Sequence, residues 1–429
     1  MELSHAVCTY ERPLRRYVCV GRSVTQRRMP RWSELEPMIG LRAPFTGPDR
    51  VQRAATIADL RDIARRRTPR AVFDYTDGAA GEELSLARSR ESFRRVEFRA
   101  HVLRDVAQVD TSVTVLGKPS ALPFMFSPTG FTRMMHHEGE PSVARVAAEF
   151  GIPYTLSTLG TTSVEDLAAV TPDARHWFQL YLWREKVSRA ELVQRVADSG
   201  YEALMLTVDT VTAGSRLRDV RNGLTIPPQL SIRTMAGMAR FPRWWGNLLT
   251  TEPLEFASLR STGGTVADLI NGVFDPSITL DDVQWLQNNW SGKVIIKGVQ
   301  SVEDAVMLAD AGVDAIVLSN HGGRQIDRAV PPLELLPDVR AAIGDRLEVY
   351  IDGGIMNGAD AVAAVGLGAD AVLVGRAYLY GLMAGGEAGV RRAAQILQSE
   401  VEQTMRLLGI ASLAELTPGM VSLRPDVGA

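Results

Sequence analysis

Short apolar runs alternate with helical patterns along most of the chain, from residue 123 to residue 375. Eight of the runs have the length and the continuous apolar character of strands buried in a parallel sheet. These predicted strands are Pro123–Ser127, Tyr154–Ser157, Trp177–Tyr181, Ala203–Val208, Val294–Lys297, Ala315–Ser319, Val349–Asp352 and Ala371–Gly375. Apolar residues at helical spacing follow the strands, and the helices they predict are Glu138–Phe150, Ser163–Ala169, Ala190–Ser199, Leu280–Asn289, Ser301–Ala311, Leu333–Ile343 and Gly358–Gly368.

Strict alternation of strand and helix indicates a parallel sheet, and eight such units indicate closure into a barrel. The alternative is an open doubly wound sheet, which needs a G-x-G-x-x-G turn after an early strand, and the chain contains no such motif. We therefore expect an α/β protein with a TIM (β/α)8 barrel. Thr56–Arg65 and Arg70–Tyr75 precede the barrel with amphipathic patterns, which predict lid helices.

The pattern also divides the chain into expected parts. Residues 29–110 are expected to form the helical lid segment, residues 111–413 the barrel and residues 414–429 a C-terminal tail. Residues 222–276 form an insertion between strands four and five that is much longer than an ordinary connection. Residues 1–28 are rich in arginine and lack any period, so we expect a disordered leader, with contact to anionic lipid as the alternative. Met29 is a second candidate start.

Composition narrows the class of protein. Hydrophobic residues make up 45% and charged residues 23% of the 429 residues, so a large core is available. The net charge of −3 gives no reason to expect a nucleic-acid partner. No apolar run approaches the ~20 residues that span a bilayer. Because Cys8 and Cys19 are the only cysteines, the barrel has no disulfide or thiolate metal site, and we expect a cytoplasmic protein without a metal.

Polar residues stand where each predicted strand ends. In a (β/α)8 barrel these carboxyl ends carry the chemistry. For any one strand, capping or turn formation is an alternative explanation, but polar groups at every end indicate a site. The ends are Ser127-Pro128-Thr129-Gly130, Ser157-Thr158, Gln179-Leu180-Tyr181, Thr207-Val208-Asp209, Lys297-Gly298, Ser319-Asn320-His321, Asp352-Gly353-Gly354 and Gly375-Arg376.

The end of strand six joins a base to a fixed cation, since Arg324 follows His321 by three residues. A carboxylate held by Arg324 would place its neighbouring carbon and hydroxyl near the imidazole, which suits proton removal from a 2-hydroxy acid. A plain turn is the alternative. The nine residues from Ser319 to Asp327 closely resemble the active-site signature of the FMN-dependent 2-hydroxy-acid oxidase and dehydrogenase family, and the resemblance covers roughly Thr56 to Leu413.

This resemblance implies FMN as the cofactor. It implies that Lys297 lies beside the N1 and O2 edge of the flavin, where a cation stabilises the charge of the reduced ring; a lysine that extends to solvent is the alternative. Many relatives carry an arginine after the Asp-Gly-Gly element, where this chain has Ile355-Met356-Asn357, so we expect the phosphate on Arg376 and backbone amides. The implied cofactor residues are Pro128, Thr129, Gly130, Ser157, Gln179, Thr207, Lys297, Ser319, Asp352, Gly353, Gly354, Gly375 and Arg376.

The resemblance also assigns the substrate side. Tyr75, Arg216 and Arg324 would hold the substrate carboxylate, and Tyr181 would contact the hydroxyl or keto oxygen. His321 would be the base, and Asp209 would stabilise the imidazolium that forms. Transfer of the Cα hydrogen as hydride and removal of the Cα proton by His321 remain alternatives that use the same residues. Both routes yield a 2-keto acid, and a homotetramer is implied.

Two further segments indicate which substrate and which electron acceptor the enzyme uses. Leu159 stands where plant-type glycolate oxidases have tryptophan, which leaves room for a methyl or larger group and favours L-lactate. Trp244 and Trp245 lie beside arginines in the long insertion, which resembles that of bacterial respiratory L-lactate dehydrogenases; Asn271–Ser277 supports the same branch. This predicts peripheral contact with the inner face of the cell membrane and a quinone as acceptor. The alternative is that the tryptophans cover the barrel or a subunit contact.

The same residues bear on the alternative functions. A soluble oxidase that uses dioxygen, or an enzyme for a larger 2-hydroxy acid, would keep the same site. An FMN isomerase or a nicotinamide-linked dehydrogenase would lack the combination of Tyr75, Arg216, His321 and Arg324. A flavin-free binding protein would be expected to have lost at least one of these residues, and all are present.

Overall fold

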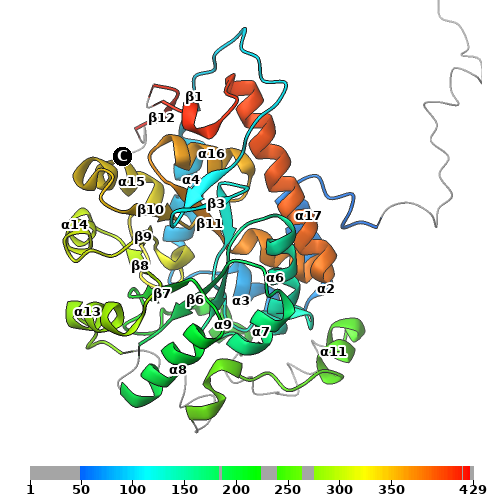
Figure 1. Cartoon of the computed structure of the whole chain (residues 1–429). Coiled ribbons are helices and arrows are strands. Elements are labelled where there is room, and N and C mark those ends of the chain that lie inside the picture. Colours follow the sequence, from blue (N-terminus) through cyan, green and yellow to red (C-terminus); the bar gives the residue numbers. More distant parts are fainter. Residues whose placement is uncertain (1–48, 183–185, 224–238, 263–274, 418, 426–429) are drawn as a thin grey trace, which may run out of the picture. The chain divides into compact units, whose positions relative to one another are not determined.

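The computed structural model describes residues 49–182, 186–223, 239–262, 275–417 and 419–425. Eight parallel strands close into a barrel in the order β10-β11-β4-β5-β6-β7-β8-β9, so the predicted TIM barrel is confirmed (Figure 1). All eight predicted strands are present, with ends that differ by at most two residues. They are β4 Phe124–Phe126, β5 Tyr154–Ser157, β6 His176–Leu180, β7 Ala203–Thr207, β8 Lys293–Val299, β9 Ala315–Leu318, β10 Glu348–Ile351 and β11 Ala371–Val374.

Helices follow the strands and cover the outside of the barrel. Each of the predicted barrel helices is found, and the eighth unit ends in a long helix that the hydrophobic pattern did not single out. These barrel helices are α6 Gly139–Glu149, α7 Val164–Val170, α8 Lys186–Asp198, α13 Leu280–Asn289, α14 Val302–Asp310, α15 Pro332–Ile343, α16 Gly358–Gly366 and α17 Arg376–Leu408. Shorter elements in the connections are α5 Thr132–Met135, α9 Leu217–Asn222, α11 Pro242–Leu249, η1 Ala257–Thr262, η2 His321–Gly323 and η3 Leu413–Glu415.

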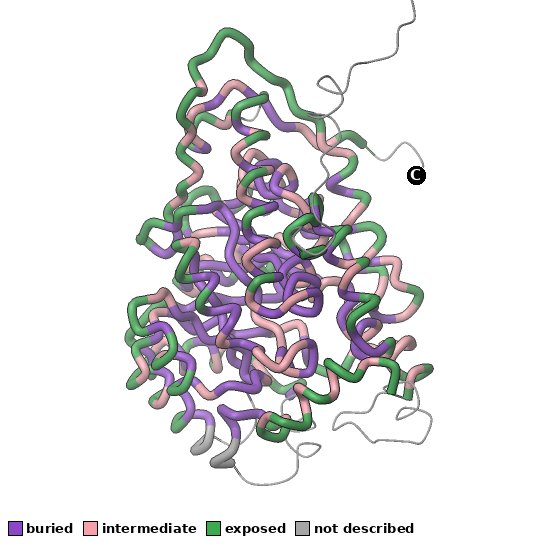
Figure 2. The backbone as a smooth tube through the Cα atoms, turned by 90° about the vertical axis from the view of Figure 1, so that its right-hand side faces the viewer, coloured by how far each residue is buried: buried purple, intermediate pink, exposed green. Residues whose placement is uncertain are grey.

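The interior of the barrel is filled by side chains. Trp177, Met205 and Tyr350 are among its fully buried members, and buried residues are concentrated in the barrel and its helices (Figure 2). A hairpin of β2 (Val113–Val115) and β3 (Lys118–Ser120) closes the amino-terminal end, because Val115 and Leu116 join the same cluster. The barrel is therefore a packed core, and only its carboxyl end is available for a site.

The lid consists of α2 (Ile57–Arg67), α3 (Arg70–Asp77) and α4 (Leu84–Arg94). Asp327 holds the start of α4, because its carboxylate accepts from the backbone N–H groups of Glu82 at 2.8 Å and Ser85 at 2.9 Å. Asn320 donates to Ser89 Oγ at 2.9 Å. The segment after β9 therefore anchors α4 as well as carrying His321.

A short strand before the barrel pairs with a strand after it. Strand β1 (Val96–Phe98) pairs antiparallel with β12 (Val421–Leu423), so the segment expected as a C-terminal tail contributes a strand. The leader expected at residues 1–28 lies outside the described residues, as do 224–238 and 263–274 of the insertion. In the part of the chain that is described, no helix has both the length and the apolar character required to span a membrane.

Candidate active site

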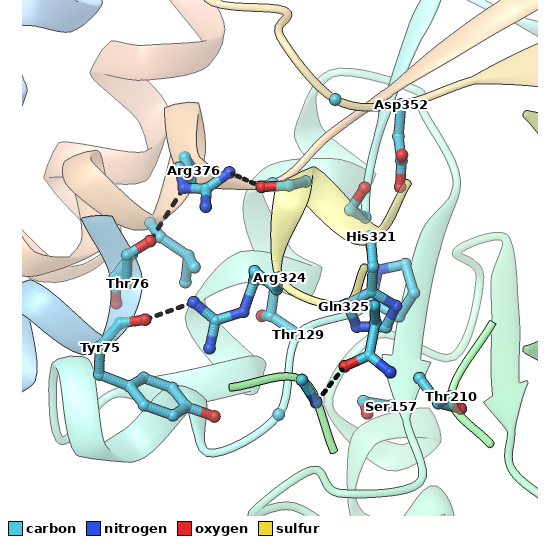
Figure 3. Close-up of a pocket in the computed structure, with 18 of the residues that line it drawn as sticks. Tyr75, Thr76, Thr129, Ser157, Thr210, His321, Arg324, Gln325, Asp352 and Arg376 are labelled. Atoms are coloured by element: carbon cyan, nitrogen blue, oxygen red, sulfur yellow. Dashed lines mark hydrogen bonds between the residues drawn. The ribbon is translucent and has the colours of Figure 1, made fainter. Parts of the chain in front are cut away.

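A cavity of about 430 Å³ opens at the carboxyl ends of the barrel strands (Figure 3). Residues from the end of every barrel strand line it, together with residues of the lid. The predicted site residues on its wall are Tyr75, Pro128, Thr129, Gly130, Ser157, Gln179, Tyr181, Thr207, Arg216, Lys297, His321, Arg324, Asp352, Gly353, Gly354, Gly375 and Arg376. Asp209 and Ser319 do not line the cavity; they lie behind the residues that do.

His321 is held in one orientation by two contacts. Its Nδ1 lies 3.0 Å from Asp209 Oδ1, and its backbone N–H donates to Ser319 Oγ at 3.0 Å. The residue has φ of 56°, a left-handed conformation that costs a non-glycine residue about 1–3 kcal/mol. With Nδ1 engaged by Asp209, Nε2 is the ring nitrogen left for the cavity.

Asp209 is suited to hold a negative charge behind His321. Burial alone would raise its pKa, but His321 and Lys297 outweigh burial, and the pKa of Asp209 is lowered. The ionised carboxylate therefore fixes an Nδ1–H tautomer and stabilises the imidazolium. The family resemblance implied this contact between the two residues, and the catalytic role of Asp209 stays a prediction.

Lys297 is a buried cation in the cavity wall. Its ammonium lies 2.8 Å from Asp352 Oδ2 and donates to Ser319 Oγ at 2.9 Å. Burial alone would lower its pKa, but Asp352 and Asp209 reverse the direction and the pKa of Lys297 is raised. Lys297 therefore stays charged at neutral pH, and the alternative of a solvent-directed lysine does not fit a side chain 5% exposed.

Polar side chains from three neighbouring strands form a chain of hydrogen bonds beside this lysine. Ser157 Oγ donates to Gln179 Oε1 at 2.9 Å, and Gln179 Nε2 donates to Thr207 Oγ1 at 3.0 Å. Each bond fixes the rotamer of its partners. The edge of the cavity thus presents oriented donors and acceptors, as a planar heterocycle requires.

Two guanidinium groups lie close to the ring of Tyr75. Arg324 Cζ lies 4.8 Å and Arg216 Cζ 5.5 Å from the ring centroid. Arg324 Nη1 donates to the carbonyl of Tyr75 at 2.5 Å, and Figure 3 shows this bond. Burial, and then repulsion from Arg216, lower the pKa of Arg324 to about 10, so it remains charged at neutral pH. An anion between the two groups would relieve their repulsion.

Tyr181 completes the substrate side. Its side chain is 9% exposed, and burial raises the pKa of its hydroxyl. The hydroxyl is therefore protonated at neutral pH and able to donate a hydrogen bond to an oxygen in the cavity.

At the end of the cavity where Arg376 and backbone amides are expected to bind the phosphate, some of the donors have partners within the protein. Arg376 donates to three carbonyls, those of Thr76 at 2.9 Å, Gly322 at 2.9 Å and Gly78 at 2.7 Å. The amides of Met356 and Asn357 both donate to Asp360 Oδ2. These donors are therefore largely committed within the protein.

The sequence pattern missed several residues of the site. Arg90 lines the cavity from α4, a helix that the hydrophobic pattern did not predict. Gln325 joins the segment after β9 to the segment after β7: its amide donates to the carbonyls of Asp209 at 3.0 Å and Thr212 at 2.8 Å. Gln325 lies in the recognised signature, yet nothing in the sequence shows which loop it would reach.

The residues present fit FMN as a ligand. The cavity is of the size usual for cofactor sites. Gly353 and Gly354 have φ of 83° and 94°, and a Cβ on Gly354 would lie 2.3 Å from the carbonyl of Ser89, so only glycine fits there. Asp352 Oδ1 is buried without a hydrogen-bond partner in the described ranges, which leaves an acceptor for a ligand hydroxyl.

Comparison with known proteins agrees with this site. The sequence matches the FMN-dependent dehydrogenase family over residues 64–423. It is 55% identical over 398 residues to a putative L-lactate dehydrogenase of Mycobacterium tuberculosis, covering 92% of this chain and 96% of that protein. It is 38% identical over 379 residues to an L-lactate dehydrogenase of Caulobacter vibrioides, covering 86% of this chain and 98% of that protein. The crystal structure of a monotopic membrane protein, (S)-mandelate dehydrogenase, matches with a TM-score of 0.83 and 34% identity over 86% of this chain and 100% of that one.

The chain therefore belongs to the FMN-dependent dehydrogenase family. It is an enzyme of FMN-dependent 2-hydroxy-acid oxidation, as the signature from Ser319 to Asp327 indicated. Relatives named as oxidases are also similar to it, so the family does not define the electron acceptor.

Proposed function

We propose that this enzyme oxidises L-lactate to pyruvate and passes the electrons to a quinone. The observation that carries the proposal is the pair of cations, Arg216 and Arg324, close to the ring of Tyr75 in a cavity that His321 also lines. Arg324 makes no ion pair with any described residue, so its charge is available for a carboxylate. A 2-hydroxy acid held there brings its hydroxyl toward the imidazole.

In the proposed reaction the protein binds, orients and handles one proton. Arg216, Arg324 and Tyr75 hold the substrate carboxylate, and the Tyr181 hydroxyl donates to the substrate oxygen. His321 accepts the proton at Nε2, and Asp209 stabilises the resulting imidazolium. FMN, when bound, supplies the two-electron acceptor for the hydrogen on Cα. The substrate loses two electrons and two protons and becomes a 2-keto acid.

The residues that would hold FMN form the other half of the cavity. Ser157, Gln179 and Thr207 would bond the edge of the ring, and the segment Pro128–Gly130 would lie along it. The Lys297 ammonium would face the part of the ring that gains negative charge. Ser319 would act indirectly, because it orients both Lys297 and His321.

A small aliphatic substrate is favoured by the wall on the substrate side. Leu159, Met135 and Val220 line the cavity, and all three are apolar. They give a methyl group an apolar environment but offer no partner for a further polar group. The names of the two bacterial relatives point to the same acid. The similarity to (S)-mandelate dehydrogenase favours a larger 2-hydroxy acid as the second candidate substrate.

The choice of a quinone rests on the dehydrogenase names and on α11. Leu249 is 71% exposed, and Arg240 and Arg243 are also exposed in this segment, which suits contact with an anionic surface. Trp244 also contacts the segment after β4, because its indole N–H donates to the carbonyl of Met134 at 3.1 Å. The alternative that the tryptophans cover the barrel therefore has support for Trp244.

The test is anaerobic mixing of the purified yellow protein with L- and D-lactate, glycolate, L-mandelate and NADH. The proposal expects rapid bleaching by L-lactate, slower bleaching by the other hydroxy acids and none by NADH. Reoxidation is then followed with a soluble quinone and with dioxygen. Faster bleaching by L-mandelate than by L-lactate would show that the substrate is a larger 2-hydroxy acid. Fastest reoxidation by dioxygen would show that the enzyme is an oxidase.

A further inference from the structure

Arg90 is a cation in the cavity wall that takes no part in the proposed reaction. It lies on α4 and lines the cavity beside Gly353 and Gly354. Its Nη1 donates to the carbonyl of Gly354 at 2.5 Å, which aims the guanidinium along this glycine segment. Arg90 is half-buried and makes no ion pair with any residue in the described ranges. A guanidinium has five N–H donors, so most of those on Arg90 remain for a ligand.

The other cation at this end is less available. Three of the five N–H donors of Arg376 go to backbone carbonyls of Thr76, Gly78 and Gly322. The segment after the two glycines, Ile355-Met356-Asn357, contains no cation. Two of its amides are occupied by Asp360, which caps the start of α16. A further cation at this end of the cavity would therefore add charge-assisted contacts to a dianion.

The charges around Arg90 favour an anion beside it. Burial lowers the pKa of Arg90, and repulsion from Arg376 and Arg94 acts in the same direction. Asp360 is the only described carboxylate among the causes that raise it, and its Oδ2 already accepts from the amides of Met356 and Asn357. A phosphate between Arg90 and Arg376 would replace a repulsion by two charge-assisted contacts.

We propose that Arg90 supplies the principal side-chain cation for the 5′-phosphate of the flavin nucleotide, with Arg376 as its neighbour. The proposal rests on FMN being the cofactor. Because Arg90 belongs to α4, the phosphate joins the lid to the carboxyl ends of β10 and β11. Binding of FMN then stabilises the docked lid, whereas riboflavin, which has the same ring without phosphate, does not make this link.

The test compares FMN with riboflavin on the deflavinated full-length protein, by titration of flavin fluorescence. Arg90→Gln is expected to weaken FMN binding by about tenfold or more and to leave riboflavin binding unchanged. Arg90→Lys keeps the charge and loses the fork, so an intermediate loss is expected. Arg94→Gln is the matched control, since Arg94 lies one turn later on α4, is 77% exposed and pairs with Glu91. It should change neither affinity.

Hydrogen exchange of α4 gives a second readout that does not depend on activity. FMN is expected to protect α4 more than riboflavin does in the wild type, and the two should become equal in Arg90→Gln. Equal weakening of FMN and riboflavin by Arg90→Gln would overturn the proposal, since Arg90 would then support only the fold. Loss of the preference for FMN in Arg376→Gln alone would also overturn it. A wild type that binds neither flavin would contradict the cofactor itself.

Discussion

At the scale of single residues, the site depends on a few side chains fixed by partners that never touch the substrate. His321 lies between Asp209 and the cavity, and Lys297, which lines the cavity together with Asp352, is held by Asp352 and Ser319. In both cases a buried carboxylate fixes the group that faces the cavity: Asp209 orients the imidazole of His321, and Asp352 raises the pKa of Lys297. The roles of these pairs can be separated by changing the carboxylate and leaving the cavity residue in place.

Asp209→Asn should lower the rate of flavin reduction by about tenfold or more. The amide can still accept from Nδ1–H, but it cannot stabilise the imidazolium by charge. Flavin absorbance and affinity should stay unchanged, because Asp209 does not line the cavity. Stopped-flow reduction by L-lactate measures the effect, and an unchanged rate would remove Asp209 from the mechanism.

Arg324→Lys should raise the KM for L-lactate by about tenfold or more. A lysine keeps the charge but cannot present two parallel donors to a carboxylate, and such charge-assisted bonds each contribute roughly 1.5–3 kcal/mol. The methyl ester of lactate is the control substrate, since it has no carboxylate to lose. If the wild type turned over acid and ester equally, no carboxylate clamp would exist.

At the scale of elements, the sequence predicts strands and their ends far better than it predicts the lid. The barrel strands are continuous apolar runs, so the pattern locates them and the site residues that follow them, such as Gln179 and Lys297. Helix α4 buries Ser85, Ser89 and Ser92 along with Phe93. A buried face made largely of serine leaves no apolar period, and Arg90 was therefore missed with its helix.

Asp77 is the point at which several elements are joined. It accepts from Arg61 on α2 at 2.5 and 2.9 Å, from Arg218 on α9 at 2.9 Å and from Tyr380 on α17 at 2.8 Å. Burial alone would raise its pKa, but these bonds outweigh burial and the pKa of Asp77 is lowered. Since Arg216 begins α9, this joint also supports the substrate side of the cavity.

Asp77→Asn should lower the free energy of unfolding by roughly 1–3 kcal/mol at neutral pH, because buried donors lose a charged acceptor. A depressed pKa stabilises the fold above the unfolded value, 3.8, and this contribution disappears as pH falls through the folded value. The difference between wild type and variant should therefore shrink below about pH 3.8. Denaturant unfolding at pH 7 and in acid tests this; equal stability at pH 7 would contradict it.

At the scale of the whole molecule, the (β/α)8 architecture was predictable because one strand-and-helix unit repeats. The short strands outside the barrel were not predictable in this way. Strands β1, β2, β3 and β12 have three residues each, too few for a hydrophobic period to appear. The contact of Gln325 with the segment after β7 depends on which distant segments lie together in the fold, and the same is true of the phosphate end of the site. A local sequence pattern carries no information about such contacts.

The predicted membrane contact involves the surface around α11 and not the cavity. Arg243→Gln with Leu249→Ser should leave turnover with a soluble dye intact and reduce quinone reduction in anionic vesicles severalfold, since a surface arginine contributes roughly 1 kcal/mol to such contact. Leu407→Ser is the matched control, because Leu407 is 70% exposed on α17 and Leu249 is 71% exposed on α11. Equal loss of both activities would assign α11 a structural role.

The central claim is that His321 removes the substrate proton in a cavity that binds FMN. Anaerobic stopped-flow reduction of the flavin by L-lactate in His321→Ala tests it most directly, with flavin content measured on the same sample. The variant should retain FMN and reduce it at least ~100-fold more slowly than the wild type. Near-normal reduction of bound flavin by His321→Ala would contradict the account.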